Sequence, residues 1–155
     1  MQTDLYRYKG CGLDNVYLLN GYVISRLKSG EDVVVIEDLE GLHRAIAMNI
    51  VESSYPLDAK TFRFLRKELD MSQKQVAQIN GVDEQTVSLW ERARIPVPQS
   101  AELLLRALAG ETMKGHSELK KLIERYNSLD REARALEHQL EFLKKADDGW
   151  VLKLG

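Results

Sequence analysis

Residues 73–92, QKQVAQINGVDEQTVSLWER, contain two short helical segments in close succession, a pattern that few folds accommodate. Gly81 separates the two segments and can adopt the positive φ angle that a tight turn between helices requires. Ala77 is small enough for two helices to cross closely, and Val87 and Trp90 lie three residues apart on one face of the second segment. The spacing therefore predicts two short helices that pack together through small and apolar side chains.

The flanking residues extend this pattern into a helical unit over residues 57–110. Asp58, Ser72, Asp83 and Ser100 are good N-caps, and apolar residues at helical spacing follow each of them. We expect this unit to be a compact bundle of about four or five helices.

The run FRFLRKELDMS, together with residues 73–92, resembles the Cro/cI-type (XRE family) helix-turn-helix domain. The agreement rests on five positions that stand in the register of that family: Gln73, Ala77, Gly81, Val87 and Trp90. Two positions differ, because Asn80 stands where the family usually buries an apolar residue and Ala93 stands where a glycine usually follows the recognition helix. The resemblance implies a lambda-repressor-like helical bundle that binds DNA through a recognition helix at about residues 84–92.

The resemblance also implies which residues meet the bases. Glu84, Gln85 and Ser88 would approach base edges in the major groove. A carboxylate can only accept hydrogen bonds, whereas a glutamine amide can bind adenine in two places. We therefore expect Gln85 to be the better base reader, and Glu84 could equally be a solvated surface charge.

Phosphate contacts are implied for four other residues. Thr86, Arg92 and Arg94 would hold backbone phosphates, and Gln73 would either touch a phosphate or support a side chain of the recognition helix. The net charge of the chain is −2, and residues 57–110 carry eight basic and seven acidic side chains. The overall charge therefore does not favour DNA binding by itself. Binding would need the cations to cluster on one face and to be doubled in a dimer.

Residues 1–56 are expected to form a small α+β domain. Asn20-Gly21 is a hairpin signal between two β-favouring runs, and Ser29-Gly30 is a second candidate turn before the run at residues 33–36. These signals predict a three-stranded antiparallel sheet. From Gly41 the apolar spacing becomes helical, which predicts a helix packed on that sheet.

Residues 111–155 carry a heptad pattern that predicts a long helix. Apolar residues alternate at spacings of three and four: Leu119, Leu122, Tyr126, Leu129, Ala133, Leu136, Leu140 and Leu143. We expect a dimerising coiled coil, although the same stripe could fold back on its own chain, and Asn127–Asp130 could divide the helix in two. A short apolar tail, Trp150–Leu152, follows.

Several classes of function are disfavoured by the composition. Cys11 is the only cysteine, which argues against disulfides and cysteine-bound metals. His43 and His116 stand alone, and no nucleophile–base set, phosphate loop or metal cluster accompanies them. We therefore expect a cytoplasmic protein without catalytic activity, metal or cofactor, since neither a signal peptide nor a membrane-length apolar run is present.

The layout, a β-rich segment before a Cro/cI-type domain, resembles antitoxins of the MqsA type, although the zinc-binding cysteines of those proteins are missing. The sequence thus favours a transcriptional regulator that binds palindromic DNA as a homodimer. It would be a repressor, or an autoregulating antitoxin with a toxin protein as partner. The alternative is an interaction scaffold whose helical domain does not bind DNA.

Overall fold

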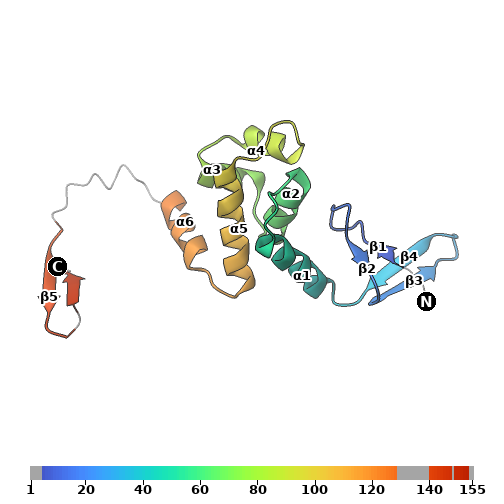
Figure 1. The fold of residues 1–155 in the computed structure, drawn as a ribbon, viewed down its shortest axis with the longest axis horizontal. Helices are drawn as coiled ribbons and strands as arrows, with labels where there is room; N and C mark the ends of the chain where they lie inside the picture. The colour runs from blue at the N-terminus through green and yellow to red at the C-terminus, as the bar shows by residue number, and fades with distance from the viewer. Residues whose placement is uncertain (1–4, 129–139, 148, 154–155) are drawn as a thin grey trace.

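The computed structural model describes residues 5–128, 140–147 and 149–153 of the 155-residue chain. In this part of the chain, helices dominate and short hairpins lie towards both ends (Figure 1). None of its helices has the length and apolar character needed to cross a membrane.

Two separate hairpins form the N-terminal region. β1 (Tyr6–Arg7) pairs with β2 (Tyr17–Leu18), and β3 (Tyr22–Arg26) pairs with β4 (Asp32–Ile36), both in antiparallel fashion. The turn predicted at Ser29-Gly30 is confirmed, since it joins β3 to β4 and Gly30 has a φ angle of 89°.

The predicted three-stranded sheet is wrong. Asn20-Gly21 connects β2 to β3, yet these strands do not pair with each other. The partner of β2 is the distant strand β1, and buried Tyr8 and Leu18 anchor that pairing. A local turn signal was therefore overridden by strand pairing between segments that are further apart in the sequence.

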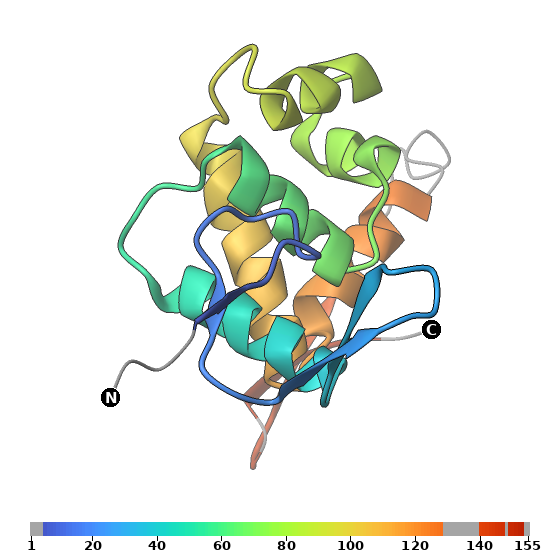
Figure 2. The same ribbon diagram turned by 90° about the vertical axis from the view of Figure 1, so that its right-hand side faces the viewer.

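α1 (Leu39–Glu52) begins where the backbone N–H of Gly41 donates to Asp38 Oδ1, at 3.1 Å. The predicted helix is thus present, and it buries Ala47 and Ile50. It packs against α2 (Ala59–Glu68) and α5 (Gln99–Met113) instead of covering a sheet (Figure 2). Its C-terminal carbonyls are satisfied by Arg106 of α5, whose Nη1 donates to the carbonyl oxygens of Ile50 (3.0 Å) and Ser53 (2.7 Å).

The bundle predicted in the centre of the chain is confirmed. It consists of α2 (Ala59–Glu68), α3 (Gln73–Asn80), α4 (Glu84–Glu91) and α5 (Gln99–Met113). The N-caps predicted at Asp58, Ser72 and Asp83 are present, and Ser72 forms a reciprocal capping box with Gln75. The N-cap predicted at Ser100 is wrong, because α5 begins at Gln99 after Pro98. The largest fully buried side chains of the core come from all four helices: Phe62, Leu65, Val76, Val87 and Leu105.

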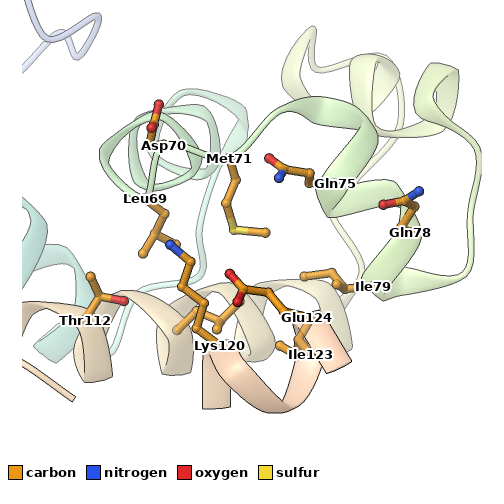
Figure 3. A pocket seen from close by; sticks show the side chains of 11 residues that line it. Leu69, Asp70, Met71, Gln75, Gln78, Ile79, Thr112, Lys120, Ile123 and Glu124 are labelled. Atoms are coloured by element: carbon orange, nitrogen blue, oxygen red, sulfur yellow. The ribbon is translucent and has the colours of Figure 1, made fainter. Parts of the chain in front are cut away.

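α6 (Glu118–Ser128) lies against α3 and α5, with Leu119 and Ile123 packed on the core. A groove of about 350 Å³ remains between α6 and the bundle, and Figure 3 shows Ile79, Ile123 and Gln78 among the side chains that line it. Part of the heptad stripe therefore folds back on its own chain, while Leu122 stays 54% exposed.

The predicted continuous helix to Leu143 is wrong. Leu143 lies in β5 (Phe142–Lys145), which pairs with β6 (Gly149–Leu152) and brings Leu143 opposite Val151. The apolar tail thus provides a strand partner for residues that the heptad pattern assigned to a helix. The heptad positions Leu129, Ala133 and Leu136 lie outside the described residues.

Candidate nucleic-acid interface

α3 and α4 are joined by a tight turn whose geometry follows from one glycine. Gly81 has a φ angle of 66°, and the N–H of Val82 donates to the carbonyl oxygen of Ala77 at 3.0 Å. Val87 and Trp90 then fix α4 from its inner face, where the Trp90 ring meets Phe62 edge-on at a centroid distance of 5.9 Å. The opposite face of α4 is left free to meet another molecule.

The predicted base readers lie on α4 with side chains outside the core. Glu84 and Gln85 are exposed in its first turn, and Ser88 is half-buried one turn later. Because the backbone of α4 is held by its buried face, these side chains project from a rigid support. A glutamine amide in this place can donate and accept at once, as paired readout of a base requires.

Thr86 is already engaged in capping α4. Its hydroxyl donates to Asp83 Oδ1 at 2.7 Å, and its backbone N–H donates to the same oxygen at 2.8 Å. These two hydrogen bonds hold the pKa of the Asp83 carboxyl below its usual value. Both the hydroxyl proton and the backbone N–H of Thr86 are thus used within the protein. The N–H groups that a helix leaves without an intrahelical partner lie beside Thr86, in the first turn of α4.

The predicted phosphate-binding arginines lie beyond the other end of α4. Arg92 and Arg94 are both exposed, and Arg92 Nε donates to the carbonyl oxygen of Ser88 at 3.4 Å. Between them, Ala93 has a φ angle of 58°, a left-handed conformation that favours glycine. The two arginines therefore occupy one rim of the α4 surface, and Glu84 and Gln85 occupy the opposite end.

Gln73 belongs to a network that ties three helices together. Its Nε2 donates to Glu91 Oε1 at 3.2 Å, while Arg66 donates to both oxygens of Glu91, with Nε to Oε2 at 2.6 Å and Nη2 to Oε1 at 2.8 Å. Arg66 Nη1 also donates to the carbonyl oxygen of Met71 at 2.9 Å. Of the two roles expected for Gln73, the structure thus contains the contact to the recognition helix.

The roles of Arg66 and Glu91 were not predicted from the sequence. A signal was available, since Arg66 follows the buried Leu65 and lies four residues after the buried Phe62, so part of its side chain must face inward. A charged side chain in that position needs a partner of opposite charge.

Asn80, one of the two unusual positions, satisfies its own amide. Its Nδ2 donates to the carbonyl oxygen of Val76 at 2.8 Å, and the neighbouring Ile79 packs against the core. The substitution of a polar residue for an apolar one is therefore accommodated without an unpaired polar group.

His43 and Cys11, in the N-terminal half, are both half-buried and form hydrogen bonds within the protein. His43 lies between Tyr8, with Nε2 at 2.7 Å from the hydroxyl oxygen, and Glu68, with Nδ1 at 2.6 Å from Oε1. Burial raises the pKa of the Tyr8 hydroxyl. Cys11 is half-buried, with its Sγ 3.7 Å from the carbonyl oxygen of Tyr8. Among the described residues, no three metal-binding side chains come together to form a metal site.

A family model described as helix-turn-helix matches residues 62–114, about a third of the chain. Residues 62–114 are a Cro/cI-type helix-turn-helix domain. The resemblance inferred from the sequence is thereby confirmed. No curated protein and no solved structure matches the chain.

The helix-turn-helix domain spans most of α2, all of α3 and α4, and α5 to its end. Such a domain implies DNA binding, and α4 is the second of the two helices that form the motif.

Proposed function

We propose that the chain is a sequence-specific transcriptional repressor that binds palindromic DNA as a homodimer. The proposal rests on the burial pattern of α4. Val87 and Trp90 bury its inner face, whereas Glu84 and Gln85 are exposed. A rigid helix with free polar side chains in its first turns is what reading of base edges requires.

Gln85 is the proposed base reader, with Glu84 and Ser88 beside it. Arg92, Arg94 and the backbone N–H groups near Thr86 are proposed to hold phosphates on either side. Gln73 supports this surface through Glu91, the last residue of α4. A dimer would double these contacts and offset the net charge of −2.

Autoregulation as an antitoxin, with a toxin protein as partner, is a special case of this proposal. The exposed apolar side chains of the β3–β4 hairpin, Val23, Ile24, Leu27, Val33 and Val35, favour some protein contact in that region. The same observation favours the alternative function, an interaction scaffold.

A selection of binding sites from random duplex DNA, followed by fluorescence anisotropy on the selected site, tests the function. We expect a palindromic consensus with two half-sites bound by two chains. Gln85→Ala should weaken binding to the selected site by about 1–3 kcal/mol and relax the preference at one base position in each half-site. Arg94→Ala should weaken binding to all duplexes by similar factors.

Gln78→Ala is the matched control, because Gln78 is an exposed glutamine of α3 that lines the groove next to α6 (Figure 3). It should leave both affinity and preference unchanged. A folded chain that binds no duplex at low salt would overturn the regulator and favour the scaffold.

A further inference from the structure

Positive charge gathers on the outer face of α2, which the proposed function does not use. Lys60, Arg63 and Lys67 follow one another at spacings of three and four residues, so they share one face of the helix. All three are exposed. Glu68, the acidic residue within α2, pairs with His43, and its Oε1 lies 2.6 Å from His43 Nδ1.

These three cations line a cavity of about 480 Å³ between α2 and the loop Gly10–Gly12. Glu91, at the end of α4, lies at the edge of the same cavity. Glu91 is the last residue of α4 and Arg92 follows it, so this cavity borders the end of α4 from which the proposed phosphate-binding arginines extend.

The acidic groups near this face are already paired. Asp14 accepts from Lys60 Nζ at 2.5 Å and lies 3.7 Å from Arg7, and Glu91 is held by Arg66. Within residues 5–128, neither Arg63 nor Lys67 pairs with a carboxylate. Two cations of this face are thus available for an outside anion.

We propose that the basic face of α2 is a second phosphate-binding site, which holds the backbone of the DNA that α4 reads. The inference rests on the proposed function and extends it. From Lys60 to Lys67 the helix rises roughly 10 Å, a length over which one DNA strand carries about three phosphates. The site would extend the footprint outward from the recognition helix without adding base specificity.

The experiment compares the salt dependence of duplex binding for the full chain and for Arg63→Gln/Lys67→Gln. The duplex is the selected site with at least about ten flanking base pairs on each side, and affinity is measured between about 50 and 400 mM salt, a range of about eightfold. We expect the slope of log K against log salt to become shallower by roughly 1.8 per chain, because two phosphate contacts are lost. The base preference should not change.

Lys120→Gln/Lys121→Gln is the matched control, because these are two exposed lysines of α6, which packs on the other side of the bundle. It should retain the slope of the unmodified chain. Circular dichroism establishes that both variants are folded.

Three outcomes would overturn the α2 site. One is an unchanged slope in the α2 variant, and another is an equal change in both variants. In the third, Arg63→Gln/Lys67→Gln loses binding of inorganic phosphate or pyrophosphate, but its DNA binding is unchanged. The site would then belong to a small ligand. If the unmodified chain binds no duplex, the proposed function fails together with the α2 site. If the unmodified chain binds duplex with the base preference that depends on Gln85, and only the salt slope is unchanged in the α2 variant, the α2 site alone fails.

Discussion

Among single residues, Ala93 has a strained, left-handed backbone conformation. A φ angle of 58° brings the Cβ atom of an L-residue close to its own backbone, at a cost of roughly 1–2 kcal/mol. We predict that Ala93→Gly raises the free energy of unfolding by about 1 kcal/mol, since glycine adopts this conformation without that penalty but loses more entropy on folding.

Urea denaturation measures this difference. Ala107→Gly provides the control, because Ala107 is exposed in the middle of α5, where glycine should cost about 1 kcal/mol. Destabilisation by both substitutions would show that the left-handed conformation at residue 93 is not present in solution.

The ion pair between Arg66 and Glu91 is the other residue-scale feature with a large expected effect. Their side chains are only 11% and 3% exposed, so removing one charge leaves the other buried without a partner. We predict that Glu91→Ala lowers the free energy of unfolding by about 3–5 kcal/mol.

The double substitution Arg66→Met/Glu91→Leu tests the reason for that loss. It removes both charges and keeps apolar volume, so most of the stability should return. If the double variant is as unstable as Glu91→Ala, the loss arises from packing and not from an unpaired charge. Because Gln73 also loses its partner in both variants, we expect weaker DNA binding even where stability is restored.

At the scale of elements, the start of α4 depends on the ionisation of Asp83. The folded-state pKa of this carboxyl lies below its usual value of 3.8 because the Thr86 hydroxyl and N–H bind the ionised form. The capping contribution is therefore fully present above pH 3.8 and is lost as the pH falls through the folded-state pKa.

Asp83→Asn tests this dependence, because asparagine can cap a helix but does not titrate. We expect the unmodified chain to lose more stability than the variant when urea denaturation is repeated from pH 6 down to pH 2, a span of about four units around the carboxyl range. Asp70→Asn removes an exposed carboxylate that caps no helix and serves as the control. Parallel pH curves for Asp83→Asn and the unmodified chain would contradict the prediction.

At the scale of the whole molecule, the chain leaves apolar surface uncovered at its C-terminal end. Leu122 of α6 and Phe142, Leu143 and Trp150 of the last hairpin are each more than half exposed. Surface of this kind usually meets another chain. We predict that the full chain is a dimer at micromolar concentration and that a chain ending at Gly115 is a monomer.

Analytical ultracentrifugation of both lengths measures the mass in units of the monomer. Leu122→Lys in the full chain should weaken the dimer without unfolding the protein, because this side chain lies outside the core. A dimer that persists after truncation would place the contact elsewhere, and the exposed β3–β4 hairpin would be the next surface to test.

The features that could be predicted from the sequence are those that depend on neighbouring residues. Ser72, Gly81 and Asp83 set the start and end of α3 and the start of α4, because caps and turns are hydrogen bonds and φ angles within a few residues. The apolar spacing of Val87 and Trp90 then fixed which face of α4 is buried. Together with the resemblance to the Cro/cI-type family, these features predicted the helix-turn-helix domain and the buried face of α4.

The pairing of segments far apart in the sequence became known from the folded chain. β2 pairs with β1 although a turn signal follows it, α1 packs on α2 and α5, and Leu143 lies in a strand opposite Val151. The network of Arg66, Glu91 and Gln73 likewise joins residues as far as 25 positions apart. Such contacts depend on which pairing buries the most apolar surface and leaves no polar group unpaired. The whole fold sets that balance, because no short stretch of sequence contains both partners.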